Sequence, residues 1–215
     1  MRSRLTMLVV GVAMLACVGF GATLSQQLGV QDFANGAIVG SSTFTGVSDV
    51  APFNTVIGAD PGGPNFAATW TFSGYGPVVG SVTSATLLIA SWDFDTESTS
   101  VSHVLSFDMN GILLTGVLDA AFKADPNTAN SQILWYTVAL PSTTFAQLAT
   151  GSATFDLTLQ NGAGVLGPTT FNGGGMDFST LTVNAAAPTP EPFTAVITMG
   201  GLAALALLRR KRAAA

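Results

Sequence analysis

The chain has 215 residues, of which 48% are hydrophobic and 9% are charged. This length fits one domain or two small ones, and the low charge excludes an intrinsically disordered chain. Between residues 26 and 187 there are eleven acidic residues and one basic residue, Lys123, so the formal charge of this segment is −10. Nucleic acid and anionic lipid attract proteins through Lys and Arg. We therefore expect no nucleic-acid partner.

The N-terminal 25 residues have the three-part pattern of a secretory signal peptide. A short basic start is followed by an apolar stretch over residues 5–18 and then by small residues. This stretch is shorter than the roughly 20 residues that a membrane span needs. Cleavage requires small side chains one and three positions before the cut. Gly19 and Gly21 meet this requirement, and so do Thr23 and Ser25, so we predict a cut between Gly21 and Ser25.

Cys17 is the only cysteine, and it lies inside the predicted signal peptide. A lipid-attachment site is an alternative reading of Met14 to Cys17, but Leu15 stands where a small residue is expected. After cleavage the exported chain would have no thiol. We therefore expect no disulfide and no thiol chemistry in the mature protein.

Residues 26–184 are predicted to form an all-β domain, a two-sheet sandwich of jelly-roll type. Short segments alternate between apolar and polar residues and are separated by Gly, Pro, Asn and Asp. This pattern is typical of strands with one buried face. We expect strands at 68–73, 82–94, 101–108, 112–118, 133–140, 152–160 and 178–184.

Three local features refine this prediction. The pair Asn110-Gly111 predicts a tight hairpin between the strands on either side of it. The apolar run from Leu87 to Ala90 predicts a strand that is buried on both faces. The single helical candidate is 143–150, with Ser142 as its cap and Gly151 at its end.

Three acidic residues, Asp93, Asp95 and Glu97, follow the long apolar strand at alternate positions. Strand parity predicts that they point to one side, where their oxygens would suit Ca²⁺, with Asp60 and Asp177 as further donors. The alternative is that these acids solvate a turn. Calcium is the only cofactor that the sequence indicates.

No set of residues indicates catalysis. His103, the only histidine, shares its predicted strand face with apolar residues, and no Gly-x-Ser-x-Gly motif accompanies it. A glycoside hydrolase would need an acid with a raised pKa beside an apolar wall, which no position indicates. We expect the chain not to be an enzyme and assign no catalytic residue.

Carbohydrate binding is the main alternative to a structural role. Sugars stack on exposed aromatic rings, and the candidates are Trp70, Trp92, Trp135, Tyr75 and Tyr136. Exposed rings would favour a carbohydrate-binding module, whereas rings inside the core would favour a structural role.

The C-terminus has three parts. Residues 185–192 form a proline-rich linker, residues 193–208 form an apolar stretch, and residues 209–215 form a basic tail. As a helix the apolar stretch would be about 24 Å long, slightly short of a hydrocarbon core of about 30 Å. The positive-inside rule predicts that the basic tail stays cytoplasmic. The characteristic residues are Pro190, Glu191 and Pro192 in the linker, and Arg209, Arg210, Lys211 and Arg212 in the tail.

These parts, in this order and paired with a signal peptide, resemble the PEP-CTERM sorting signal. The segment from Ser84 to Leu118 also looks like domains that accompany this tail. The resemblance implies a substrate of an exosortase, a membrane protease-transpeptidase that acts near the Pro-Glu-Pro motif. It also implies a Gram-negative host that makes extracellular polysaccharide. An ordinary tail anchor with a proline-rich stalk is the alternative.

Together these features predict an exported structural or adhesive protein. The secretion translocon would export it, and its C-terminal transmembrane helix would hold it in the inner membrane. An exosortase-like enzyme would then release it to the cell surface or the extracellular matrix, where polysaccharide is a candidate partner.

Overall fold

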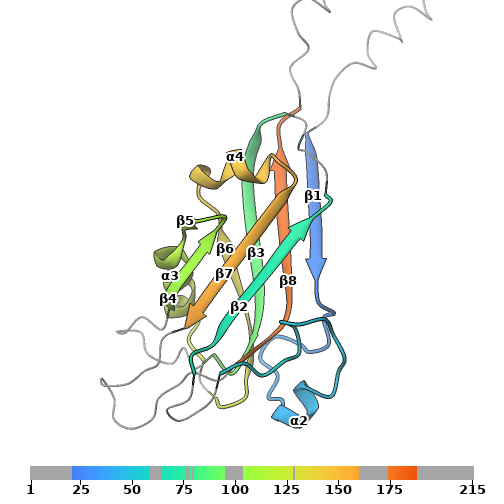
Figure 1. Ribbon diagram of the computed structural model, residues 1–215, viewed down its shortest axis with the longest axis vertical. Coiled ribbons are helices and arrows are strands. Elements are labelled where there is room, and N and C mark those ends of the chain that lie inside the picture. The colour runs from blue at the N-terminus through green and yellow to red at the C-terminus, as the bar shows by residue number, and fades with distance from the viewer. Residues whose placement is uncertain are drawn as a thin grey trace, which may run out of the picture.

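The computed structural model describes residues 21–58, 64–75, 78, 80–94, 104–127, 129–159 and 174–187. Its main feature is a pair of four-stranded antiparallel sheets that pack face to face, one in front of the other in Figure 1. The all-β sandwich predicted from the sequence is therefore confirmed. No helix within these ranges is long and apolar enough to cross a membrane, and residues 193–208 lie outside them.

The first sheet has the strand order β1-β8-β3-β6. It consists of β1 (Ala22–Leu28), β8 (Gly175–Ala185), β3 (Val82–Trp92) and β6 (Ile133–Ala139). The second sheet has the order β2-β7-β4-β5. It consists of β2 (Ala67–Ser73), β7 (Ser152–Leu159), β4 (Val104–Met109) and β5 (Ile112–Leu113). The first and last of the described strands are thus neighbours.

The core between the sheets follows from the alternation in the sequence. In β2, Ala68, Trp70 and Phe72 are buried, while the residues between them are exposed. The same period holds in β7, where Phe155 stacks on Trp70 with ring centroids 5.7 Å apart and on Phe107 at 5.9 Å. Stacked aromatic pairs add to the stabilisation that burial of apolar area provides.

The predicted double burial of Leu87 to Ala90 holds only near the end of β3. Leu88 is half-buried, whereas Ala90 and Trp92 are buried. A long connection between β1 and β2 covers this end of the sheet and includes α2 (Ser41–Phe44). The Phe44 ring stacks on Trp92 at 4.8 Å, and the Trp92 indole N–H donates to the Val39 carbonyl at 2.7 Å.

The hairpin predicted at Asn110-Gly111 is confirmed. Met109 of β4 pairs with Ile112 of β5, which leaves Asn110 and Gly111 as a two-residue loop. Both have positive φ, 49° and 79°. This is the requirement of a type I′ turn, which matches the right-handed twist of the two strands.

The strand predicted over 112–118 is wrong beyond its second residue. The chain forms the helix α3 (Thr115–Ala124) instead, which packs on β4 and β6. A helical period is present in the sequence, because Leu114, Leu118 and Phe122 are spaced by four residues and all are buried. The apolar residues after the hairpin fit both the two-residue period of a strand and the longer period of a helix, and the chain forms the helix.

The helical candidate over 143–150 is confirmed as a short connector. It comprises the 3₁₀ turn η1 (Ser142–Thr144) and the helix α4 (Phe145–Leu148). Ser142 does not cap it, because the residue before η1 is Pro141, whose carbonyl accepts from the Thr144 hydroxyl at 2.7 Å. Gly151 follows the helix with φ of 88°, as the predicted end requires.

The two ends of the described domain lie side by side at the top of Figure 1. Ala22 pairs with Ala185, and a Cβ atom placed on Gly21 would be 2.7 Å from the Ala185 carbonyl oxygen. β1 begins within the predicted signal-peptide range 1–25, and β8 includes the first residue of the predicted linker.

Candidate functional site

Asp93 terminates β3 and does not continue it. It has φ of 58°, is 9% exposed, and donates its N–H to the Gln132 carbonyl at 3.0 Å. Its carboxylate accepts the Ser131 N–H at 2.6 Å. Strand alternation ends at Trp92, so parity no longer places Asp93 on one side with its acidic neighbours. The carboxylate has a structural role, holding the turn that leads into β6.

Apart from Asp177, the other residues of the predicted calcium site lie outside the part of the chain that the structure describes. Asp60, Asp95 and Glu97 lie outside the described residues, as do His103 and the sorting residues from Pro190 to Arg212. Within the described ranges, no three His, Cys, Asp or Glu residues gather as metal ligands would. Calcium binding stays a prediction.

Asp177, named from the sequence as a further calcium donor, is instead the centre of a buried polar cluster. Its side chain is fully buried near the start of β8. One carboxylate oxygen accepts from the Asp32 N–H at 3.4 Å and from the Asn54 side-chain amide at 3.3 Å. The other oxygen accepts from the Phe33 N–H at 3.2 Å. Asp177 thus joins two separate parts of the β1–β2 connection to the last strand.

Burial raises the pKa of Asp177, and the nearby charge of Asp32 raises it further. The three hydrogen bonds favour the ionised form and oppose this shift. Lys123 is the only basic residue in the described ranges, and it pairs with Asp119 at 2.6 Å on α3. Asp177 therefore relies on N–H donors for its stabilisation.

The backbone around Asp177 strengthens the same attachment. Asn54 donates its N–H to the Met176 carbonyl at 2.7 Å, and Ile57 exchanges two hydrogen bonds with Gly174 at 2.8 and 3.0 Å. Gly29, with φ of 76°, leaves no room for a side chain, because a Cβ atom there would be 2.6 Å from the Asp177 carbonyl oxygen. The connection between β1 and β2 is therefore firmly attached to the start of β8.

A groove of about 280 Å³ lies beside this attachment. It is bounded by the end of β1, by the segment around the cis Ala51–Pro52 bond, and by the outer edge of β2. The Leu159 N–H donates to the Phe66 carbonyl, so these two residues form a hydrogen-bonded pair of the antiparallel ladder. Hydrogen-bonded pairs occur at every second residue, so the backbone groups of Ala68 and Trp70 also bond to β7. Thr69 and Thr71 consequently present their backbone groups to the groove.

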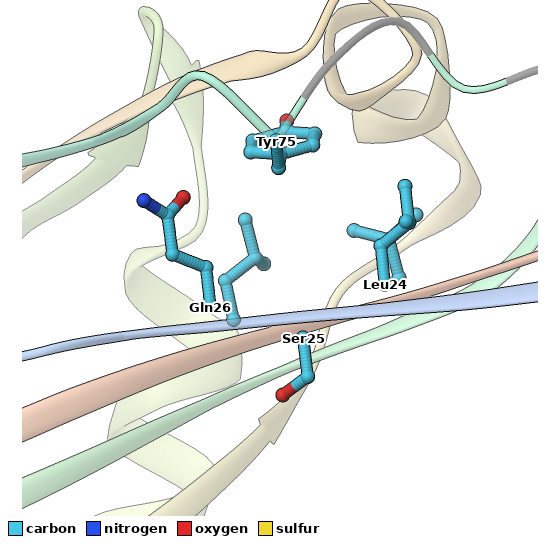
Figure 2. A pocket seen from close by; sticks show the side chains of 6 residues that line it. Leu24, Ser25, Gln26 and Tyr75 are labelled. Carbon is cyan, nitrogen blue, oxygen red and sulfur yellow. The ribbon is translucent and has the colours of Figure 1, made fainter.

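A much smaller cavity, of about 10 Å³, lies between the sheets beside the middle of β1. Figure 2 shows Leu24 and Gln26 on the side of β1 that faces Tyr75, and Ser25 on the other side. The Gln26 amide donates to the Ser73 carbonyl at 3.0 Å, while its buried oxygen has no partner. This volume suits one water molecule.

The aromatic residues considered for sugar stacking lie mostly inside the domain. Trp70 is 3% exposed, Trp92 is 4% exposed and Tyr136 is 2% exposed. Tyr75 is half-buried and donates its hydroxyl to the Leu148 carbonyl at 3.0 Å, and burial raises its pKa. Trp135 is half-buried and packs edge-on against Phe178 at 5.3 Å.

The chain matches no known family model, and comparison with curated proteins and with solved structures found no match either.

Proposed function

We propose that the chain is an exported protein of the cell surface or extracellular matrix with a structural or adhesive role. The carrying observation is that the first and last strands are paired, so that Gly21 and Ala185 lie together at one end of the domain. Both candidate sorting segments can therefore leave the sandwich at the same end. A signal peptide that ends at Gly21 and a PEP-CTERM-like tail that is cut near Pro192 could be attached and removed without disturbing either sheet.

A jelly-roll class is part of this proposal. Jelly rolls have eight strands arranged as two Greek keys in facing sheets. The facing orders β1-β8-β3-β6 and β2-β7-β4-β5 support this class, because sequential strands mostly alternate between the sheets. The fold does not identify a function, since one fold serves many activities.

Burial of the aromatic residues favours a structural role over a carbohydrate-binding one. Trp70 and Trp92 use their rings in packing, and neither ring face is available for stacking on a sugar. Polysaccharide binding stays an alternative for the groove beside β2, where edge backbone groups of Thr69 and Thr71 line a space of about 280 Å³.

A glycoside hydrolase is the least favoured alternative. Asp177 has the raised pKa that a general acid needs. However, both of its oxygens accept hydrogen bonds from groups of the β1–β2 connection, and it lines neither of the two cavities described above. We therefore assign Asp177 a structural role.

The proposal is tested by the intact mass of the native protein, purified separately from membrane and extracellular fractions of its host. We expect the extracellular form to lack the signal peptide and the residues after about Pro192. Glu191→Ala should leave the tail uncut and the protein in the membrane fraction. Asp125→Ala removes an exposed carboxylate elsewhere and should be processed normally. An intact C-terminus on wild-type protein in the membrane fraction would show a permanent tail anchor.

A further inference from the structure

The first four residues after Gly21 form more than half of β1. Their partners in β8 are Ala185 for Ala22, Asn184 for Thr23, Val183 for Leu24 and Thr182 for Ser25, which are four of the seven pairs between these strands. Among the described strands β1 pairs only with β8, so its position in the sheet depends on this ladder.

Side chains reinforce the same four residues. The Thr23 hydroxyl donates to the Asn184 side-chain oxygen at 2.7 Å, and the Ser25 and Thr182 hydroxyls lie 3.3 Å apart. On the opposite side of the strand, Leu24 is partly buried and packs against the main core. Polar residues face out and Leu24 faces in, as a strand at the edge of a sandwich requires.

The two cleavage positions that the sequence allows therefore have different consequences for the fold. A cut after Gly21 leaves β1 whole, and the mature chain begins at the first residue of the strand. A cut after Ser25 removes four of its seven residues, including Leu24. The remaining three residues of β1 would leave residues 182–185 of β8 without a neighbouring strand at this edge of the sheet.

We propose that signal peptidase hydrolyses the Gly21–Ala22 bond, and that Gly19 and Gly21 are the small residues it recognises. The inference rests on the export proposed above. Water supplies the hydroxyl that completes a carboxylate on Gly21, which leaves with the signal peptide. The nitrogen of Ala22 becomes a terminal ammonium group on the mature protein. This ammonium is formed opposite Ala185, whose carbonyl oxygen already lies beside Gly21.

Two matched variants of the full-length chain test this position. Gly21→Leu places a bulky side chain directly before the proposed cut, and Ser25→Leu does the same at the alternative cut. Ser25 is exposed, so its replacement leaves the core unchanged. N-terminal sequencing and intact mass are measured on wild type and both variants expressed in a Gram-negative host.

We expect wild type and Ser25→Leu to begin at Ala22 and Gly21→Leu to accumulate as precursor. A wild-type product that begins at Gln26, with Ser25→Leu accumulating instead, would overturn the proposed position while export stands. Wild-type protein that retains Met1 in every fraction would overturn the export proposal itself. A start at any other residue would also contradict cleavage at Gly21.

Discussion

Asp177 holds the β1–β2 connection in place, because it accepts hydrogen bonds from two distant parts of it. We expect Asp177→Asn to lower the free energy of unfolding by about 1–3 kcal/mol, since an amide nitrogen then faces N–H donors that need an acceptor. Chemical denaturation measures the change. Asp125→Asn, on an exposed side chain, should change stability by less than about 0.5 kcal/mol. Equal effects of the two variants would contradict the role given to Asp177.

The raised pKa of Asp177 predicts how its contribution changes with pH. Burial lifts the pKa above the ordinary value of 3.8, so the folded chain holds the proton more tightly than the unfolded chain does. The stabilisation that this tighter proton binding gives to the folded chain is complete below the ordinary pKa, and it is lost as the pH rises through the raised pKa. The stability difference between wild type and Asp177→Asn should therefore shrink as the pH rises across this interval. Denaturation at a series of pH values checks it, and a difference that widens would show a lowered pKa.

Two glycines with the same backbone conformation should respond differently to substitution. Gly29 and Gly36 have φ of 76° and 82°, but only Gly29 has neighbours within 4 Å of an added Cβ. Gly36→Ala should cost about 1–2 kcal/mol, the strain of a left-handed alanine. Gly29→Ala should cost about 1–3 kcal/mol more, because the Asp177 carbonyl and the Phe53 ring must move. Thermal and chemical unfolding of both variants compare the two costs, and equal costs would show that the connection is loosely packed.

At the scale of elements, α3 fills a position that alternation in the sequence did not predict. Phe122 on this helix packs against Tyr136 at 4.5 Å and Phe94 at 6.1 Å. Phe122→Ala should lower stability by about 3–5 kcal/mol. Leu113→Ala, on a side chain that is 78% exposed, should change it by less than about 0.5 kcal/mol. A small effect of Phe122→Ala in denaturation experiments would mean that α3 is dispensable.

Strands with one buried face, such as β2 and β7, were predictable because the two-residue period of apolar residues is a local signal. The hairpin was equally local, since Asn110 and Gly111 determine its turn type. The attachment made by Asp177 was not predictable, because its partners Phe33 and Asn54 lie 144 and 123 residues away in the sequence. Nothing near Asp177 distinguishes a buried acceptor from a metal ligand.

The strand β1 could not be predicted either, because its partner is also distant in sequence. It has few apolar residues, and its role follows only from its pairing with β8 at the far end of the chain. The end of β3 was predicted wrongly for a local reason. Asp93 continues the alternation of β3 in the sequence, yet its positive φ ends the strand. The sequence pattern thus placed the strand correctly and its last residue wrongly.

At the scale of the whole molecule, the pairing of the first and last strands closes the domain into one unit. Thr23 and Asn184 are 161 residues apart in sequence, and their side chains are in hydrogen-bond contact at 2.7 Å. Cleavage of the signal peptide would remove Cys17, so an engineered pair of cysteines would meet no competing thiol. We expect the double variant Thr23→Cys with Asn184→Cys to form a disulfide when exported to an oxidising compartment.

A cross-link at this position would close a loop that contains nearly the whole domain, and long loops give the largest loss of entropy in the unfolded chain. We expect the oxidised double variant to be more stable than its reduced form by about 2–4 kcal/mol. Thiol titration, electrophoresis without reductant and denaturation with and without reductant measure both effects. The single variant Thr23→Cys controls for the loss of the Thr23 hydroxyl. Free thiols in the folded double variant would show that β1 is not paired with β8 in this register, and would remove the basis for both ends leaving the domain together.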